Sequence, residues 1–186
     1  MMEPFEEKTM LESMTVLVDS REQPSRRAED RYKAFGVPYE RATLSYGDYT
    51  YCAKFPDGSV LNRNAGTVIP YGLVIERKMS LDELEGCFTR DRKRFEAEFL
   101  RAQEASCRIC LLVENATWEN LFNGRYKNKM KPEAFAASLE AFIVRYNLLL
   151  IFCKEETSGR IIHDLLYRDL KERIERGEFD DLNLSR

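Results

Sequence analysis

The sequence predicts a single α/β domain in which a mixed central sheet is flanked by helices. Short apolar runs of strand length alternate with longer segments whose apolar residues recur every three or four positions. Arg108–Val113 and Leu148–Cys153 are two such runs, each flanked by helical patterns, as expected for parallel strands joined by crossover helices. A chain of 186 residues is long enough for one such core and too short for two comfortable ones.

The two ends of the chain differ in composition from the region between them. Residues 1–14 are acidic and lack clear periodicity, so we predict a flexible leader. Residues 178–186 are also acidic, and we predict a flexible tail there. The domain itself is therefore expected to span residues 15–177.

The first part of the domain has the pattern of a strand, a helix and then antiparallel strands. Thr15–Asp19 is a short apolar run that ends in a charge, which is typical of a buried strand. Pro24 and Ser25 open a polar helix that ends at Gly36. Further strands are expected at about 39–44 and 48–53, followed by a turn at 56–58 and a hairpin loop at 59–70.

The next strand, Leu73–Lys78, is an apolar run that ends in three charges. Residues two apart share a face of a strand, so Glu76 and Lys78 point together while Arg77 points the other way. A carboxylate and an ammonium group are thus expected side by side. An exposed salt bridge at the end of a strand is the simplest alternative, because Glu-x-Lys is a common sequence.

A helix is expected directly after this strand. Ser80 and Glu83 form a capping box, which places Asp82 in the first helical turn, close to the end of the strand. The apolar periodicity continues from Leu81 to about Ala105, so we predict one continuous helix.

The apolar face of this predicted helix carries Arg92, between Phe88 and Phe95. An arginine in that position needs an anionic partner, which could be a core carboxylate or a DNA phosphate. Arg90 and Arg94 are alternatives to Arg92, and a solvated helix face is the simpler interpretation of the whole cluster.

Three helical segments complete the domain. Thr117 can cap a short helix that reaches Phe122, and Pro132 opens a longer one with an apolar face. The last helix is expected from Thr157 or Ser158 to the glycine at 177.

The charge balance argues against a generally basic surface. Lys and Arg number 29 and Asp and Glu 32, so contacts with nucleic-acid phosphates must come from local patches. The segment 124–131 is one such patch, because its basic residues alternate with other residues. If the segment is extended, the basic side chains project on one side and can follow a phosphate backbone, although a solvated loop without a ligand is an equal alternative. These side chains are Arg125, Lys127, Lys129 and Lys131.

Cysteine and histidine usage narrows the chemistry. The five cysteines are an odd number scattered through apparent core strands, which favours reduced thiols over a disulfide framework. His163 is the single histidine, so a site with several histidines is excluded. We see neither a membrane-spanning run nor a secretory leader, and we expect a cytoplasmic, intracellular protein that does not act at a membrane.

The carboxylate and lysine at the end of the 73–78 strand suit metal-dependent hydrolysis of phosphodiester bonds. Such a site needs further carboxylates, and Asp48, Asp19 and Glu22 are the candidates upstream. Asp48 is expected on a neighbouring antiparallel strand, and Gly47 before it allows a bend or a close backbone approach, although an ordinary turn is an equal alternative. Carboxylates that lie close together raise one another's pKa, so such a cluster implies a cation.

These motifs together resemble the XPF-type family of structure-specific DNA endonucleases. The signature of that family is Gly-Asp followed at a distance by Glu-Arg-Lys-x-x-x-Asp, and here Gly47-Asp48 precedes Glu76-Arg77-Lys78 and Asp82. The resemblance extends from about Thr15 to Ile174. It implies a restriction-endonuclease-like α/β core, which the predicted order of strands and helices matches.

The resemblance also implies roles for individual residues. Asp48 and Glu76 would bind Mg²⁺ or Mn²⁺, with the backbone carbonyl of Arg77 as a candidate further ligand, and Lys78 would position or activate the attacking water. The acidic cluster would be completed, directly or through water, by Asp19 and Glu22. The side chains that would hold the site together are Arg77, Asp82 and Arg92.

The implied partner is DNA, at branches or at junctions between single and double strands, and a homodimer is a further expectation. We find no tandem helix-hairpin-helix module after the nuclease domain, which resembles stand-alone bacterial or phage versions of the family. Two alternatives remain: a non-catalytic DNA-binding or scaffold protein on the same fold, and a sequence-specific restriction-type nuclease.

Overall fold

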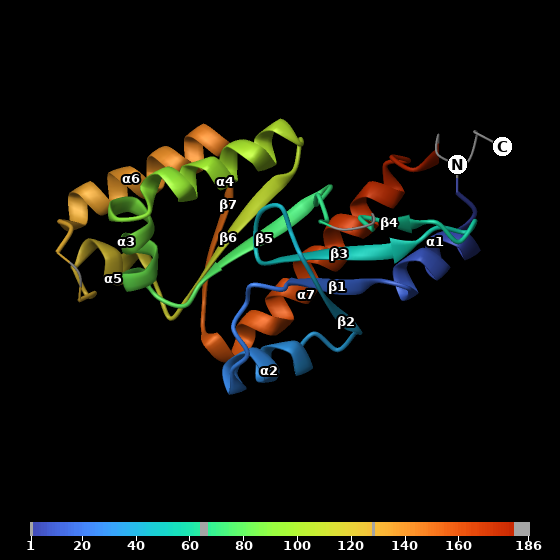
Figure 1. Ribbon diagram of the computed structural model, residues 1–186, viewed down its shortest axis with the longest axis horizontal. Helices are drawn as coiled ribbons and strands as arrows, with labels where there is room; N and C mark the ends of the chain where they lie inside the picture. Colours follow the sequence, from blue (N-terminus) through green and yellow to red (C-terminus); the bar gives the residue numbers. More distant parts are fainter. Residues whose placement is uncertain (1, 64–66, 128, 181–186) are drawn as a thin grey trace.

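The computed structural model describes residues 2–63, 67–127 and 129–180. A seven-stranded sheet runs through the middle of the molecule, with helices on both faces (Figure 1). The strands are β1 Thr15–Asp19, β2 Tyr39–Ala42, β3 Tyr49–Lys54, β4 Val60–Leu61, β5 Leu73–Lys78, β6 Arg108–Glu114 and β7 Leu149–Cys153. The helices are α1 Pro4–Glu12, α2 Arg26–Lys33, α3 Leu81–Thr89, α4 Arg92–Glu104, α5 Trp118–Phe122, α6 Pro132–Tyr146 and α7 Glu155–Glu175.

The sheet is mixed, and its main order is β2-β1-β3-β5-β6-β7, with β4 paired to β3. Strand β3 is antiparallel to both β1 and β5, whereas β5, β6 and β7 run parallel to one another. The α/β class, the mixed sheet and the parallel pairing of β6 with β7 are therefore confirmed. This order places β5 between β3 and β6, so the ends of strands from both halves of the chain meet beside Lys78.

Each face of the sheet has its own hydrophobic core. Helices α1, α2 and α7 cover the face that carries Ile75 and Tyr49, and α3, α4 and α6 cover the face that carries Val74. Successive residues of β5 contribute to opposite cores, as strand geometry requires. Among the helices of the described residues, none is both long and apolar enough to cross a membrane.

The two chain ends differ from the prediction of flexible segments. Residues 4–12 form helix α1, and Met2, Met10 and Met14 are buried against the core that α7 covers, so the prediction of a flexible leader is wrong there. Met10 and Met14 are four positions apart, but the acidic residues of this segment obscure the apolar face, and only tertiary packing shows that these methionines are buried. Phe179 is also buried, with its ring 5.5 Å from that of Phe55. The predicted tail is thus packed at its start, and its remainder, 181–186, lies outside the described residues.

The helix predicted from Leu81 to Ala105 is two helices. The backbone N–H groups of Arg90 and Asp91 both donate to the carbonyl of Gly86, which ends α3, and α4 begins at Arg92. The apolar periodicity continues across the break because both helices pack on the same core.

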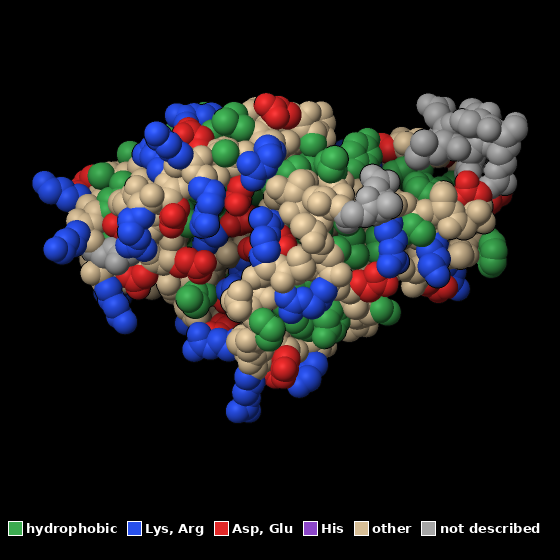
Figure 2. All heavy atoms as spheres, viewed as in Figure 1, with side chains coloured by type: hydrophobic (Ala, Val, Ile, Leu, Met, Phe, Trp, Pro, Cys, Tyr) green, Lys and Arg blue, Asp and Glu red, His purple; other side chains and the backbone are tan. Residues whose placement is uncertain are grey.

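Charged side chains are unevenly distributed on the surface. In the view of Figure 2, acidic and basic groups are mixed over the middle of the molecule, and Lys and Arg side chains project from the end that carries α3, α5 and α6.

Candidate active site

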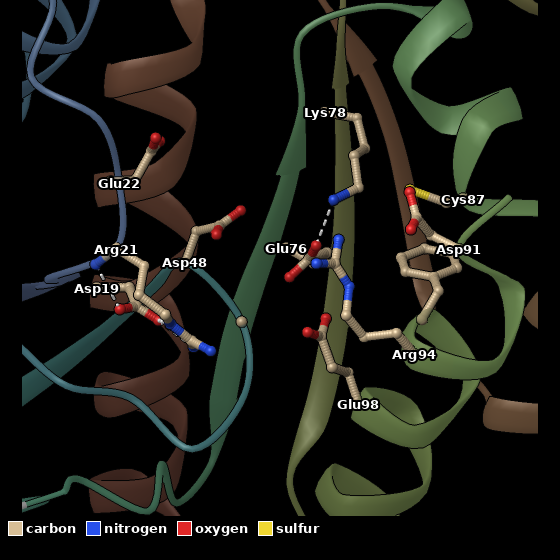
Figure 3. Close-up of a pocket in the computed structure, with 12 residues that line it drawn as sticks. Asp19, Arg21, Glu22, Asp48, Glu76, Lys78, Cys87, Asp91, Arg94 and Glu98 are labelled. Carbon is tan, nitrogen blue, oxygen red and sulfur yellow. Dashed lines mark hydrogen bonds and ion pairs between the residues drawn. The ribbon is translucent and has the colours of Figure 1, made fainter.

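A cavity of about 200 Å³ lies where β1, β3 and β5 approach α3 and α4 (Figure 3). Acidic side chains outnumber basic ones on its wall, which concentrates negative charge in a small space. The lining residues are Asp19, Arg21, Glu22, Gly47, Asp48, Glu76, Lys78, Cys87, Asp91, Arg94, Phe95 and Glu98.

Asp48 and Glu76 come from neighbouring antiparallel strands, as predicted. Tyr49 pairs with Ile75, and the N–H of Asp48 donates to the carbonyl of Ile75 at 2.8 Å. Asp48 is therefore opposite Glu76, and both side chains point into the cavity (Figure 3). Two carboxylates that are 28 positions apart in the sequence thus face one space.

Gly47 allows this close approach of the two strands. Its φ is +71°, in the left-handed region, and a Cβ built there would lie 2.3 Å from Cγ2 of Val74 and 3.3 Å from the carbonyl oxygen of Ile75. Any larger residue would push the turn away from β5. The close backbone approach predicted for this glycine is confirmed.

Lys78 lies beside Glu76 on the same face of β5, with Nζ 2.5 Å from Oε1 and 5.4 Å from the centre of the Phe95 ring. Burial lowers the pKa of Lys78, but the carboxylates of Glu76 and Asp48 outweigh burial and raise it above its ordinary value. Lys78 therefore holds its proton tightly. This favours charge compensation and orientation of water over removal of a proton.

The two carboxylates are destabilised as anions. Burial raises the pKa of Asp48 well above its ordinary value, and the charge of Glu76 raises it further, against the opposing effects of Lys78 and the N–H of Arg77. Burial also raises the pKa of Glu76, although Lys78 counteracts it. One ammonium group does not balance this cluster, so a further cation would stabilise its ionised form.

Asp19 reaches the cavity wall but both of its carboxylate oxygens already have partners. Oδ1 accepts the backbone N–H of Arg21 at 2.9 Å, and Oδ2 accepts from Nε of Arg21 at 2.8 Å and from its Nη2. The geometry therefore does not support Asp19 as a direct metal ligand. The sequence could not show this, because Asp-x-Arg spacing does not reveal where the arginine side chain turns.

Glu22 and Arg77 contact each other, as expected for groups that hold the site together. Oε1 of Glu22 accepts from Nε of Arg77 at 3.2 Å and from the Tyr49 hydroxyl at 2.5 Å. Burial would raise the pKa of Glu22, but Arg77, Tyr49 and Arg31 together lower it. Glu22 is thus a stable anion at the cavity wall.

Besides Arg77, two of the predicted catalytic residues do not line the cavity. Asp82 is in the first turn of α3, where its Oδ1 accepts the backbone N–H of Lys127 at 2.5 Å, so it anchors the 124–131 segment. Arg92 is exposed at the start of α4. The alternative Arg94 lines the cavity instead.

Helix α4 also contributes Glu98, which the sequence analysis missed. Arg94 and Glu98 are four residues apart, so they share a helix face, and both point toward Glu76 (Figure 3). Burial raises the pKa of Glu98, and the charge of Asp48 raises it further. Asp91, Arg94 and Glu98 recur at helical spacing beside the apolar stripe, and this spacing could have indicated Glu98. Using it requires knowing where α4 begins.

The donor set suits a hard divalent cation. Mg²⁺ is commonly bound through one or two carboxylates, with waters and substrate phosphate as its other ligands. Asp48 and Glu76 supply two such carboxylates on one cavity. Within the described residues, no three acidic, cysteine or histidine side chains converge closely enough to hold a metal by themselves. The site therefore fits a cation that keeps part of its hydration, and not one enclosed by protein ligands.

The basic segment after α5 is held in place by its other residues. Tyr126 packs on the ring of Phe135 at 5.3 Å and donates its hydroxyl to the carbonyl of Met130 at 2.6 Å, while the N–H of Met130 donates to Glu85 at 3.2 Å. The described residues on either side of 128 include bends and no strand. All four basic side chains are exposed, namely those of Arg125, Lys127, Lys129 and Lys131.

Comparison with solved structures shows the same fold in XPF from Aeropyrum pernix. One structure has 21% sequence identity and a TM-score of 0.54, and the match covers 82% of this chain and 59% of that one. A second, XPF from Aeropyrum pernix in complex with DNA, has 22% identity and a TM-score of 0.57, and the match covers 86% of this chain and 66% of that one. This chain thus spans less than two thirds of either structure.

Comparison with curated protein sequences gives no match. Comparison with protein families matches residues 18–165 to the ERCC4 domain. This range includes β1 to β7 and the whole cavity wall, apart from the start of β1. The resemblance inferred from the sequence motifs is thereby confirmed, and the chain belongs to the ERCC4 domain family.

Proposed function

We propose that this chain is a metal-dependent endonuclease that hydrolyses phosphodiester bonds in branched or structured DNA, such as flaps, forks and junctions. The observation that carries the proposal is the meeting of Asp48, Glu76 and Lys78 in one cavity. DNA as the substrate is supported by membership of the ERCC4 domain family and by the similar fold of an XPF structure described as a complex with DNA.

In this proposal Asp48 and Glu76 hold Mg²⁺ or Mn²⁺. A bound divalent cation would polarise the phosphate and lower the pKa of the attacking water. Glu76 would exchange its contact with Lys78 for the cation, which frees the ammonium group to orient water or offset phosphate charge. Arg94 lines the same cavity and would bind a phosphate oxygen that flanks the reacting one.

The test measures cleavage of labelled flap, fork, junction and linear duplex DNA with Mg²⁺, Mn²⁺ or EDTA. Wild-type protein should cut branched DNA only with metal, and Asp48→Asn should lower the rate by at least about a hundredfold. Asp164→Asn is the control, because Asp164 is exposed on α7 and does not line the cavity. Metal-dependent cleavage that survives in Asp48→Asn would contradict the proposal.

The same substrates distinguish the two alternatives. A scaffold protein would bind branched DNA and cut none of it. A restriction-type enzyme would cut linear duplexes at a fixed sequence, so each branched structure is prepared in several unrelated sequences. Cleavage that follows the branch point and not the sequence supports the proposed function.

We also propose that the basic segment binds the DNA backbone. Its four exposed side chains belong to a loop whose backbone N–H groups donate to Asp82 and Glu85 of α3, the helix that follows Lys78 in the chain. Replacing all four with alanine should weaken DNA binding by at least about tenfold at low salt and reduce its salt dependence. The substituted residues are Arg125, Lys127, Lys129 and Lys131.

A matched control removes four basic side chains from other surfaces. It replaces residues whose side chains are exposed on α1, α2 and after α7, and it changes the net charge equally. Equal DNA affinities of the two variants would contradict a specific role for the segment. The control positions are Lys8, Arg26, Lys33 and Arg176.

Homodimer formation remains a prediction. Phe122 and Val144 are large apolar side chains exposed on α5 and α6, and such residues are frequent in interfaces. Sedimentation equilibrium of the wild type and of Val144→Glu tests this prediction. A wild-type protein that remains monomeric across the accessible concentration range would contradict it.

A further inference from the structure

Behind the cavity, on the other face of β5, charged side chains from separate elements form a buried network. It consists of Arg31 on α2, Arg77 on β5, Glu114 at the end of β6, and Glu22 with Tyr49. Arg31 is 6% exposed and Glu114 is 1% exposed, and neither lines the cavity.

The charges in this network alternate. Arg31 Nη2 is 3.1 Å from Oε1 of Glu114, and its Nη1 is 3.7 Å from Oε1 of Glu22. Arg77 also lies between both acids, 3.1 Å from Oε2 of Glu114 and 3.2 Å from Oε1 of Glu22. Two arginines and two glutamates therefore neutralise one another, and each arginine is fixed from two sides.

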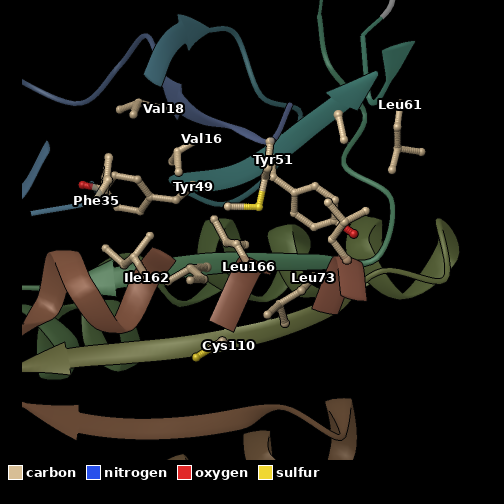
Figure 4. Close-up of a cluster of buried hydrophobic side chains, with 14 of the residues drawn as sticks. Val16, Val18, Phe35, Tyr49, Tyr51, Leu61, Leu73, Cys110, Ile162 and Leu166 are labelled. Carbon is tan, nitrogen blue, oxygen red and sulfur yellow. The ribbon is translucent and has the colours of Figure 1, made fainter. Parts of the chain in front are cut away.

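Tyr49 joins the network to the antiparallel strands. Its hydroxyl accepts from Nη1 of Arg31 at 3.2 Å and donates to Oε1 of Glu22 at 2.5 Å. Its ring lies beside Phe35 in the core between the sheet and α7 (Figure 4). Tyr49 directly follows Asp48, so the network fixes the strand that carries the proposed metal ligand.

Arg77 makes the second connection to the same carboxylate. Its backbone N–H donates to Oδ2 of Asp48 at 2.8 Å, while its guanidinium is held by Glu22 and Glu114 on the opposite face. A shift of the guanidinium would therefore move a donor that orients Asp48. Glu22 also reaches the cavity wall directly.

Stability alone does not explain such a network. Removing two pairs of buried charges from water is costly, and well-packed apolar side chains of similar volume often stabilise a core equally well. What apolar side chains cannot do is fix the backbone and a carboxylate at defined positions through directional contacts.

We propose that Arg31 and Glu114 are positioning residues for the proposed nuclease site. Acting through Arg77, Tyr49 and Glu22, they hold Asp48 in the orientation that binds the cation. The inference rests on the proposed function. It adds two residues that neither line the cavity nor belong to the basic segment.

The experiment separates positioning from stability with two variants. Glu114→Gln keeps the shape of the side chain and removes its charge. Arg31→Met combined with Glu114→Leu replaces the buried pair with apolar groups and leaves Arg77 paired with Glu22. Glu12→Gln, at an exposed position on α1, is the control. The measurements are kcat, KM for branched DNA, the Mn²⁺ dissociation constant by calorimetry, and the urea midpoint.

We expect Glu114→Gln to lower kcat by at least about tenfold and to weaken Mn²⁺ binding by a similar factor, with KM for DNA within about twofold of wild type. The double variant should recover the wild-type urea midpoint without recovering kcat or Mn²⁺ affinity. If Arg31 and Glu114 only stabilised the fold, the double variant would recover the urea midpoint, kcat and the Mn²⁺ affinity together.

The outcomes also separate this inference from the proposed function. An active wild type together with a fully active double variant, or with a Glu114→Gln variant that binds Mn²⁺ and turns over normally, overturns only the positioning role. A wild type that neither cleaves DNA nor binds Mn²⁺ overturns both.

Discussion

The two faces of strand β5 carry the same kinds of side chain in opposite states of balance. On one face, Glu76 and Lys78 share a cavity with Asp48. Burial raises the pKa of both carboxylates, helped by the charge of Glu76 at Asp48 and by that of Glu98 at Glu76. On the other, Arg77 lies between Glu22 and Glu114, and the pKa of Glu22 is lowered. The cavity face therefore carries more negative than positive charge, whereas the two arginines and two glutamates of the network balance one another.

This difference distinguishes the proposed metal site on one face of β5 from the charged network that holds it in place on the other. A cavity with excess negative charge is unfavourable by itself and favourable when a cation binds, so its free energy depends on the ligand. A neutral network has no such requirement and stays fixed whether a ligand is present or not. Because strand residues alternate between faces, one six-residue strand serves both.

The largest expected effect comes from unbalancing the neutral face. Glu114→Ala leaves Arg31 and Arg77 without one of their two acidic partners in a buried position, and should lower the free energy of unfolding by about 3–5 kcal/mol. Urea titration at pH 7 measures it. A loss below about 1 kcal/mol would show that the two faces do not differ in this way.

A smaller loss is expected where α2, which carries Arg31, packs on α7. A Cβ on Gly159 would lie 2.4 Å from the carbonyl oxygen of Arg31 and 2.8 Å from Cβ of Ala34, so Gly159→Ala should cost about 2–3 kcal/mol. Gly86→Ala is the control, because its Cβ would meet only the flexible end of Arg90. If both variants unfold at the same urea concentration, the close packing has no energetic importance.

A gain in stability is expected when the buried carboxylate of Asp48, on the cavity face, is replaced. Because the pKa of Asp48 is raised in the folded protein, its contribution to stability is present below the unfolded pKa and is lost as pH rises through the folded one. At pH 7, without divalent metal, Asp48→Asn should therefore be more stable than wild type by about 1 kcal/mol. The gain should vanish near pH 3. Urea titration at both pH values checks the sign, and a destabilised variant at pH 7 would contradict it.

The smallest effects on stability are expected on α4, where Arg92 and Arg94 are both exposed. Alanine at either position should change stability by less than about 0.5 kcal/mol. Cleavage should distinguish them, because only Arg94 lines the cavity: Arg94→Ala should lower kcat by about tenfold and Arg92→Ala by less than twofold. Equal rates of the two variants would contradict the assignment of Arg94.

The sequence was most informative where local rules determine geometry. Strand alternation placed Glu76 and Lys78 on one face, and the pairing of two predicted strands brought Asp48 beside them. The sequence was least informative about which side chains contact one another. Whether Arg21 turns onto Asp19, and whether Asp82 contacts the cavity or the basic segment, depends on side-chain directions that spacing does not encode.

Helix ends were the other source of error. The stop between α3 and α4 involves ordinary helix-forming residues, and the stripe of Phe88, Phe95 and Phe99 continues across it. A periodicity argument therefore favours one helix and assigns Arg92 to the site. In the structure α4 begins at Arg92, and Arg94 and Glu98 are the residues of α4 that line the cavity together with Phe95.

By itself, the sequence determined the α/β class, the family and the two carboxylates beside a lysine, because strand periodicity and a spaced motif are properties of the chain order. Only the tertiary structure decided that Arg31 and Glu114, 83 positions apart, close a neutral network behind that site. Charges become partners through the pairing and packing of distant elements, and the free energy of a buried charge depends on the partners that the fold brings within a few ångströms.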